Sequence, residues 1–251
     1  MSTPASRPTS GTPTGPAAAP RRRAVVVDDE RALADVVRSY LERDGFEVAT
    51  AADGEAGLEL VRTVDPDLVV LDLGLPGMDG IEVCRSLRTF SDCYVVMLTA
   101  RADEVDMLIG LSVGADDYMT KPFSPRELMA RVRTLLRRPR ASTRPAEPPV
   151  PPLTIGALRI DTAAREVHLD GAPVNLTRTE FDVLAALAAR PHAVLSRSAL
   201  IEAVWGANWV GDEHLVDVHV LHVRQKLGDT ATEQRYVRTV RGVGYRIGTG
   251  G

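Results

Sequence analysis

The sequence predicts an α/β domain with a doubly wound, five-stranded parallel sheet of flavodoxin-like topology, followed by a winged helix-turn-helix domain of the α+β class. Three observations predict this order. The first half alternates apolar runs with amphipathic segments. Residues 137–152 contain six prolines and four arginines, a composition that excludes a helix or a sheet interior. The second half has short strands, then three helical segments, then a pair of strands.

Five apolar runs in the first half are predicted to form the sheet. They occupy residues 24–27, 46–49, 68–71, 94–98 and 117–120. Segments with helical spacing occupy residues 31–44, 54–63, 79–88, 103–113 and 124–136. Strands that alternate with helices form parallel sheets, and nearly continuous apolar strands are buried on both faces. Ser124 to Glu127 are predicted to form a capping box for the last helix, with Pro125 at its first position.

The second half is predicted to start with short alternating strands over about 153–175. Three helices are then expected, ending near Ala189, Trp205 and Leu227. The first follows a capping box, Thr177-Arg178-Thr179-Glu180. Strands at 236–239 and 244–247 flank a glycine-containing turn and should form a hairpin. Three helices before a hairpin are typical of a winged helix.

These segments divide the chain into four parts. We expect a disordered leader over 1–22, a first domain over 23–137, a linker over 138–152 and a second domain over 153–249. The Pro-, Ser- and Thr-rich leader ends in three arginines, and the apolar stretch after it is too short for a signal peptide.

Composition points to a soluble cytoplasmic protein. The 251 residues are 44% hydrophobic and 25% charged, which is ordinary for globular chains. No run of about 18 apolar residues exists, so no membrane span is expected. Cys84 and Cys93 have no other metal-type ligands around them and are expected to be reduced thiols rather than a metal or redox site.

Charge is unevenly distributed along the chain. Residues 24–136 carry 22 acidic and 11 basic side chains, whereas residues 153–251 carry 11 of each. Within 224–246, six basic residues accompany two acidic ones. This locally basic end is consistent with a nucleic-acid surface near the C-terminus.

Four polar features follow the predicted strands of the first domain: Asp28-Asp29-Glu30, Asp72, Thr99 and Lys121-Pro122. Ligands of open α/β sheets bind beyond the carboxyl ends of the strands. Clustered carboxylates repel one another, and Mg²⁺ would relieve that repulsion. A carboxylate beside Mg²⁺ can attack phosphorus and form an aspartyl phosphate, whose oxygens a lysine would neutralise. Lys121 is one of only two lysines among 30 basic residues, which suggests a need for a compact charge there.

The order of these features resembles the receiver domain of two-component response regulators across about 24–136. The matching stretches are Val-Val-Asp-Asp-Glu at 26–30, Leu-Asp-Leu-Gly-Leu-Pro-Gly-Met-Asp-Gly at 71–80, Leu-Thr-Ala-Arg at 98–101 and Gly-Ala-Asp-Asp-Tyr-Met-Thr-Lys-Pro-Phe at 114–123.

This resemblance implies a role for each polar residue. Asp72 would be phosphorylated, and Mg²⁺ would be held by Asp28, Asp29, Asp72 and the backbone carbonyl of Gly74. Thr99 would be the switch hydroxyl, Tyr118 the aromatic that turns inward on activation, and Lys121 the phosphoryl contact. The Lys121-Pro122 peptide would be cis.

The third helix of the second domain has a core stripe of Val216, Val220, Val223 and Leu227. The opposite side carries Val218, Leu221, His222 and Gln225, and we expect Val218 and His222 to reach into a major groove together. Arg224 and Lys226 flank the stripe and suit phosphate contacts.

Residues 153–248 resemble the effector domain of the OmpR/PhoB-type regulators. The resemblance rests on Leu-Thr-Arg-Thr-Glu-Phe-Asp-Val-Leu at 176–184, Val-Asp-Val-His-Val at 216–220, Val-Arg-Gln-Lys-Leu-Gly at 223–228 and Val-Arg-Thr-Val-Arg-Gly-Val-Gly-Tyr-Arg-Ile at 237–247. It implies that the third helix reads a major groove, that a wing at Arg241-Gly242 enters a minor groove, and that the loop between Trp205 and Trp209 meets RNA polymerase. The expected DNA-contacting residues are Val218, His219, His222, Arg224, Lys226, Arg238 and Arg241.

Two positions depart from the family pattern. Many relatives have two basic residues where Leu221-His222 stand, so their preferred DNA sequence cannot be transferred. Relatives also usually have lysine at Met107, which pairs across the active dimer with a glutamate equivalent to Glu127. Dimerisation through the face made by 103–113, 117–120 and 124–136 is still expected. Its candidate ion pairs are Asp117 with Arg131 and Asp116 with Arg133.

Three other functions are compatible with parts of the sequence. A phosphatase of the haloacid-dehalogenase kind needs a second acid two residues after its nucleophile, but Gly74 occupies that place after Asp72. A DNA-binding regulator that is not phosphorylated remains an alternative. A stand-alone signalling adaptor is disfavoured by the complete second domain. The favoured function is a transcriptional regulator that accepts a phosphoryl group from a sensor histidine kinase, forms a homodimer and binds promoter DNA. Its receiver would catalyse its own phosphorylation and dephosphorylation.

Overall fold

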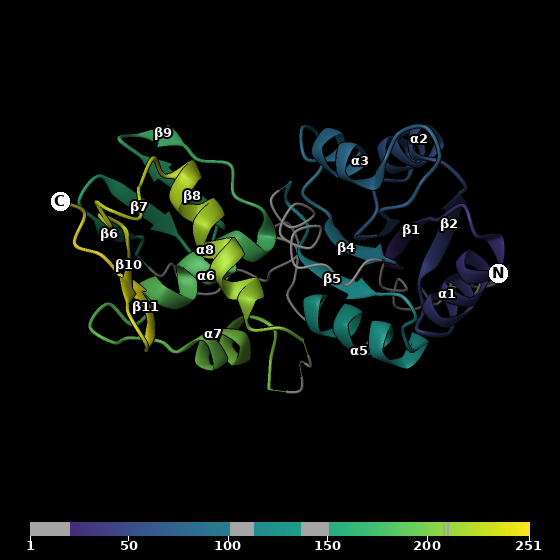
Figure 1. Cartoon of the computed structure of the whole chain (residues 1–251). Coiled ribbons are helices and arrows are strands. Elements are labelled where there is room, and N and C mark those ends of the chain that lie inside the picture. Colours follow the sequence, from purple (N-terminus) through teal and green to yellow (C-terminus); the bar gives the residue numbers. More distant parts are fainter. Residues whose placement is uncertain (1–20, 101–112, 137–150, 208, 210) are drawn as a thin grey trace, which may run out of the picture.

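The computed structural model describes residues 21–100, 113–136, 151–207, 209 and 211–251, and these form two domains (Figure 1). The N-terminal domain has a parallel sheet of order β2-β1-β3-β4-β5. Its strands are β1 (Arg23–Val27), β2 (Glu47–Ala51), β3 (Leu68–Asp72), β4 (Tyr94–Thr99) and β5 (Asp117–Thr120). Its described helices are α1 (Arg31–Arg43), α2 (Gly54–Val64), α3 (Gly80–Leu87) and α5 (Pro125–Leu135). The doubly wound prediction is confirmed.

Helices cover both faces of this sheet. Helix α1 contacts α5 on one face, and α2 contacts α3 on the other (Figure 1). Every residue of β3 and β4 is buried, as a strand covered on both faces requires. The strand order changes direction between β1 and β3, so the carboxyl ends of these two strands open a crevice.

Two segments of this domain differ from the prediction or lie outside the described residues. The helix expected over 103–113 falls almost wholly outside the described residues, as do most of the leader and the linker. The capping box at Ser124 is wrong, because the Ser124 side chain makes no cap hydrogen bond. Glu127 instead pairs with Arg131 one turn later, at 3.0 Å. Pro125 does occupy the first turn of α5, which fits its fixed backbone angle.

The C-terminal domain begins with an antiparallel sheet of order β6-β7-β8-β9. The strands are β6 (Leu153–Ile155), β7 (Leu158–Asp161), β8 (Glu166–Leu169) and β9 (Ala172–Pro173). Three helices follow, α6 (Arg178–Ala188), α7 (Arg197–Val204) and α8 (His214–Lys226), and then the antiparallel hairpin of β10 (Val237–Val240) and β11 (Gly244–Ile247). This is the predicted winged helix-turn-helix.

Helix α6 begins with the predicted capping box. The Thr177 hydroxyl accepts a hydrogen bond from the backbone of Glu180, and the Glu180 carboxylate accepts one from the backbone of Thr177. Two of the unpaired amides at the start of the helix are thereby satisfied.

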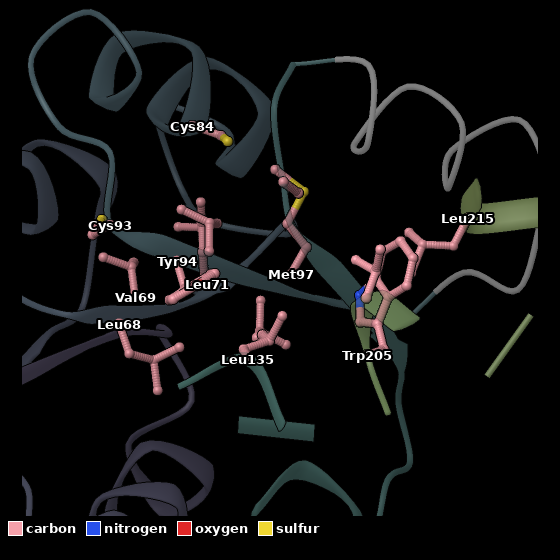
Figure 2. Close-up of a cluster of buried hydrophobic side chains, with 14 of the residues drawn as sticks. Leu68, Val69, Leu71, Cys84, Cys93, Tyr94, Met97, Leu135, Trp205 and Leu215 are labelled. Atoms are coloured by element: carbon pink, nitrogen blue, oxygen red, sulfur yellow. The ribbon is translucent and has the colours of Figure 1, made fainter. Parts of the chain in front are cut away.

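The buried apolar side chains of the two domains belong to one contiguous cluster. Figure 2 shows Met97 of β4 in this cluster and, beyond it, Trp205 and Leu215 of the C-terminal domain. Cys84 and Cys93 are buried thiols without a disulfide, as expected. Among the described helices, none is long and apolar enough to cross a membrane.

Candidate functional site

The carboxyl ends of four strands gather the predicted polar residues of the N-terminal domain. Asp28 follows β1, Asp72 ends β3, Thr99 ends β4 and Lys121 follows β5. An open cavity of about 480 Å³ is lined by Asp72, Thr99 and Lys121, together with Gly74 and Asp79. Asp28, Asp72 and Thr99 are buried, so the cavity presents a few enclosed polar groups rather than a hydrated surface.

Lys121 joins the two buried carboxylates. Its Nζ lies 2.8 Å from Asp72 Oδ1 and 3.0 Å from Asp28 Oδ2. Burial opposes the ammonium charge, but the hydrogen bonds and charges of Asp72 and Asp28 outweigh it and raise the pKa of Lys121. Burial raises the pKa of Asp28, against the pull of Lys121. The single ammonium of Lys121 therefore pairs with two neighbouring carboxylates, and the carboxylate charge of the site is only partly neutralised.

Two glycines lie close to Asp72, one in the loop after it and one at the start of α3. The backbone N–H of Gly74 donates to Asp72 Oδ2 at 3.1 Å, which orients the carboxylate. A Cβ at Gly80, the first residue of α3, would lie well inside contact distance of the Asp72 carbonyl oxygen. Glycine at position 80 therefore lets the start of α3 lie directly against the end of β3.

The acidic residues fit a hard divalent cation. Carboxylate oxygens of Asp28, Asp29 and Asp72 all lie within 4.8 Å of one another. Asp29 is exposed, whereas the other two are buried, so a cation would enter from the solvent side. Oxygen donors with room for water are the ligands that Mg²⁺ prefers.

Tyr118 lies farther from the cavity, on β5. Its side chain is half-buried, and burial together with Asp212 and Asp117 raises its pKa to about 12. It lines a second cavity of about 230 Å³, with Arg131 of α5 and Asp212 of the C-terminal domain. The Lys121-Pro122 peptide is cis, as the resemblance implied.

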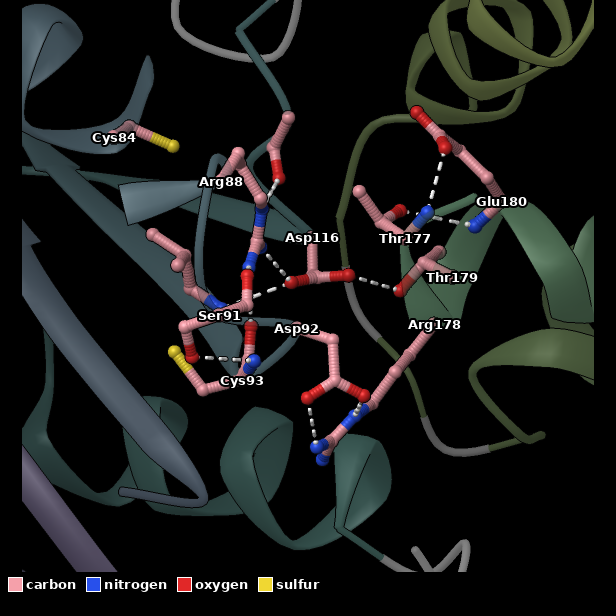
Figure 3. Close-up of polar contacts among 12 residues, drawn as sticks. Cys84, Arg88, Ser91, Asp92, Cys93, Asp116, Thr177, Arg178, Thr179 and Glu180 are labelled. Atoms are coloured by element: carbon pink, nitrogen blue, oxygen red, sulfur yellow. Dashed lines mark hydrogen bonds and ion pairs between the residues drawn. The ribbon is translucent and has the colours of Figure 1, made fainter. Parts of the chain in front are cut away.

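Asp116 and Asp117 were expected at a dimer face, but here both contact the C-terminal domain of the same chain. Asp116 Oδ2 accepts hydrogen bonds from Arg88 Nη2 at 2.7 Å and from the Val95 backbone at 2.9 Å. Its other oxygen accepts one from the Thr179 hydroxyl of α6 at 2.7 Å (Figure 3). Asp116 is thus a buried residue whose hydrogen bonds link the two domains.

Three further contacts join the two domains. Arg178 of α6 binds Asp92 with two nitrogens, at 2.9 and 3.1 Å (Figure 3). The indole of Trp209 donates to Asp117 at 3.3 Å, and the guanidinium of Arg131 lies 5.4 Å from the Trp209 ring.

Within this single chain, the two basic residues expected at the dimer face both pair with carboxylates of the N-terminal domain. Arg131 pairs with Asp117 at 2.9 Å, within the N-terminal domain. Arg133 does not meet Asp116, because it forms a bidentate contact with Asp44 at the end of α1. Asp116 forms its ion pair with Arg88 instead.

Helix α8 is buried over a wider arc than the sequence predicted. The stripe of Val216, Val220, Val223 and Leu227 is buried as expected. The prediction that Val218 and His222 lie on an exposed face is wrong in this structure, since their exposed fractions are both 4%. His222 packs on α6, with Nδ1 3.5 Å from Glu180 Oε1.

His219 is completely buried at the same flank of α8. Its ring lies 5.5 Å from that of Trp205. Burial lowers the pKa of His219 to about 4, although the carboxylates of Asp116 and Glu180 act in the opposite direction. Trp205 in turn lies 6.0 Å from the ring of Trp209, whose indole binds Asp117, so this flank lies near the N-terminal domain.

The cationic residues expected at DNA differ in accessibility. Arg224 is buried and binds the Val237 carbonyl at 2.9 Å and the Thr239 hydroxyl at 2.7 Å. Lys226 lies 2.6 Å from Glu180. Arg238 is half-buried and donates to the Gln234 carbonyl at 3.3 Å, whereas Arg241 is exposed at the tip of the hairpin.

The exposed stripe of α8 instead presents His214, Leu221 and Gln225. The sequence placed Leu221 and Gln225 opposite the core but did not select them as DNA contacts. Their spacing of four residues was the available signal.

Comparisons with known proteins agree with this geometry. A family model described as "Response regulator receiver domain" matches residues 24–133. A second model, "Transcriptional regulatory protein, C terminal", matches residues 171–247.

Relatives match nearly the whole chain. The DNA-binding response regulator MtrA of Mycolicibacterium smegmatis is 48% identical over 228 residues, which cover 91% of this chain and 97% of that protein. The transcriptional regulatory protein CseB of Streptomyces avermitilis is 44% identical, with 88% and 95% covered. The alkaline phosphatase synthesis transcriptional regulatory protein PhoP of Bacillus subtilis is 41% identical, with 90% and 96% covered. Among solved structures, a mutant of RitR matches with a TM-score of 0.72 and 28% identity, over 90% of this chain and 98% of that one.

Proposed function

This chain belongs to the OmpR/PhoB-type response regulators, and we propose that Asp72 is the residue whose phosphorylation controls its C-terminal domain. It is a DNA-binding transcriptional regulator of a two-component system rather than a metabolic enzyme. We take residues 23–137 as the receiver domain and 153–249 as the DNA-binding domain. The observation that supports Asp72 most strongly is its position in the cavity, with Lys121 Nζ at 2.8 Å and Thr99 among the lining residues.

The proposed reaction transfers a phosphoryl group from a histidine of the sensor kinase. A carboxylate oxygen of Asp72 attacks phosphorus, a P–O bond forms, and the P–N bond breaks with its electron pair leaving on the imidazole. Lys121 is placed to neutralise the phosphoryl oxygens, and the Thr99 hydroxyl to donate a hydrogen bond to one of them. The receiver itself supplies these groups, so we propose that it also catalyses its own dephosphorylation by water.

We propose that Mg²⁺ binds Asp28, Asp29, Asp72 and the backbone carbonyl of Gly74. The metal would supply the positive charge that Lys121 alone does not provide for these carboxylates and the incoming phosphoryl group. Asp29 is exposed, so the side of the proposed site that it forms faces solvent.

We propose that phosphorylation acts by releasing the contacts between the domains. Thr99 lies at the end of β4 and Tyr118 on the adjacent β5, the strand that also carries Asp117. A shift of these residues toward a phosphoryl group would disturb the contacts of Asp116 and Asp117 with Thr179 and Trp209. The released face, with Asp116, Asp117, Arg131 and Arg133, would then be free to form a homodimer.

The DNA-binding domain would use α8 in the major groove and Arg241 in the minor groove of promoter DNA. We extend the proposal to RNA polymerase as a partner of the loop between Trp205 and Trp209, which the family resemblance implies. A regulator that binds promoters acts where the chromosome lies, so we propose a cytoplasmic protein.

The experiment is the intact mass of the full chain after incubation with Mg²⁺ and acetyl phosphate. Wild type should gain about 80 Da, the mass of one phosphoryl group, and Asp72→Ala should gain nothing. Excess EDTA should abolish the gain in wild type. If folded wild type shows no gain, the alternative of a phosphorylation-independent regulator replaces this proposal.

A further inference from the structure

The flank of α8 that carries Val218, His219 and His222 is buried, and each of these side chains is at most 4% exposed. His222 keeps a carboxylate partner there, since its Nδ1 lies 3.5 Å from Glu180 Oε1. Neither ring nitrogen of His219 has a hydrogen bond of ordinary geometry among the described residues. His219 is therefore the histidine of this flank that has lost water without gaining a partner, which is an unfavourable exchange.

Two rings and two carboxylates lie close to His219. The Trp205 ring is 5.5 Å away and the His222 ring 6.4 Å away. The charged groups that face it are the carboxylates of Asp116, just before β5, and of Glu180 on α6. Both carboxylates and the Asp116 backbone favour the protonated ring, and His222 opposes it, but burial outweighs them all and lowers the pKa of His219 to about 4.

The ring contacts of His219 lead directly to the boundary between the domains. Trp205 lies 6.0 Å from Trp209, and the Trp209 indole donates to Asp117 of the receiver at 3.3 Å. Release of the domain contacts would therefore bring water to this flank of α8. In water, an imidazole has a pKa near 6.5. The open arrangement of the domains thus binds a proton at His219 more tightly than the closed arrangement does.

We propose that the proton is a second input to this regulator, in which protonation of His219 opens the two domains without phosphorylation of Asp72. The closed arrangement, which keeps His219 neutral, loses stability as the pH falls from about 6.5 toward 4. Between pH 7.5 and pH 6.0, the ratio of open to closed chains should rise about fourfold. Glu180 stays ionised over this range, because its pKa is lowered to about 2. This inference rests on the proposed opening of the domains but not on phosphorylation.

The test measures how often the buried flank of α8 becomes accessible. A cysteine is introduced at Val218, which is 4% exposed, or at Leu221, which is 48% exposed on the same helix. Each full chain is labelled with dithiodipyridine, and the rate for the parent chain, which carries the buried Cys84 and Cys93, is subtracted. The rate for Val218→Cys divided by that for Leu221→Cys reports opening, because the ionisation of the introduced thiol largely cancels.

This labelling ratio should rise about fourfold from pH 7.5 to pH 6.0 in the parent chain and in His192→Leu, an exposed histidine. His219→Leu and His219→Gln should both abolish the rise. Leucine fills the site with an apolar group and glutamine with a polar one, so a folding defect in one variant leaves the other informative. A ratio that does not change with pH, or that rises equally in both His219 variants, would overturn the inference.

The same assay separates this inference from control through Asp72. Mg²⁺ and beryllofluoride at pH 7.5 should raise the labelling ratio if occupation of the phosphorylation site opens the domains. No rise with beryllofluoride, together with the rise in acid, would reject that part of the proposed function and support the proton as an input.

The consequence for DNA is measured with a duplex that the activated full chain selects from a random-sequence library. Between pH 7.5 and pH 6.0, unactivated wild type should gain about fourfold in affinity beyond any gain of the activated protein, which is already open. An equal pH response of two forms that differ in labelling ratio would overturn the inference. Failure to select any duplex would instead reject the DNA-binding function, and the labelling ratio would still decide whether acid opens the domains.

Discussion

His219 is the single residue whose environment makes the clearest prediction about pH. Its pKa is lowered to about 4 by burial, from an ordinary value near 6.5. It is therefore neutral in the folded protein at a pH where the unfolded chain would protonate it. Unfolding takes up a proton between about pH 6.5 and pH 4, so the folded state loses stability as the pH falls through this range.

We expect the free energy of unfolding of wild type to fall about 1 kcal/mol more between pH 7 and pH 5.5 than that of His219→Leu. Denaturant titration followed by tryptophan fluorescence suits this measurement, because Trp205 and Trp209 are the only tryptophans and both lie in the C-terminal domain. His192→Leu, at an exposed position, should keep the pH dependence of wild type. Equal pH dependence in His219→Leu and wild type would show that His219 does not titrate with folding.

At the scale of single elements, the segments that begin at Thr177 and at Ser124 both match the capping-box pattern, but only the first forms a helix cap. Thr177 caps α6 through a hydrogen bond, whereas Ser124 makes none at the start of α5. Thr177→Ala should therefore reduce the free energy of unfolding of the C-terminal domain by about 1 kcal/mol, the usual effect of losing an N-cap. Ser124→Ala should change the receiver by less than about 0.5 kcal/mol. Equal losses measured by denaturant titration would contradict the assigned caps.

The elements and the receiver site were predictable from sequence because their signals are local. Apolar runs mark strands, helical spacing marks helices, and polar residues at strand ends converge at one edge of a parallel sheet. Asp28, Asp72, Thr99 and Lys121 illustrate this, since each directly ends or follows a strand.

The surroundings of α8 were not predictable in the same way. A helical wheel locates one core stripe, but it does not reveal that Glu180 of α6 covers His222 or that β10 engages Arg224. Likewise, the sequence does not reveal that Arg88 is the partner of Asp116 or that Asp44 is the partner of Arg133. Such contacts depend on tertiary packing between distant segments.

At the scale of the whole molecule, each domain covers part of the surface that we propose for dimerisation or for DNA binding in the other. The receiver face with Asp116 and Asp117 is occupied by Thr179 and Trp209, and one flank of α8 is buried beside it. We expect weakening of this interface to favour DNA binding without phosphorylation. Asp92→Arg places a like charge opposite Arg178, with the DNA-binding domain itself unchanged.

Unphosphorylated Asp92→Arg should bind a selected duplex about fivefold more tightly than wild type, if the substitution weakens the closed arrangement by roughly 1 kcal/mol. Asp35→Arg is the matched control, because it makes the same change of charge on α1, where Asp35 pairs with Arg38 of its own helix. If the two variants bind the duplex equally well, any gain in affinity comes from the change of charge alone. That result would contradict the view that the domain interface inhibits DNA binding.

The affinity of the full chain for a selected duplex, measured by fluorescence anisotropy with and without acetyl phosphate and Mg²⁺, tests directly whether Asp72 controls the DNA-binding domain. Acetyl phosphate should increase the affinity of wild type and leave that of Asp72→Asn unchanged. Equal affinities for both proteins in both conditions would contradict control through Asp72 and support a regulator that binds DNA independently of phosphorylation.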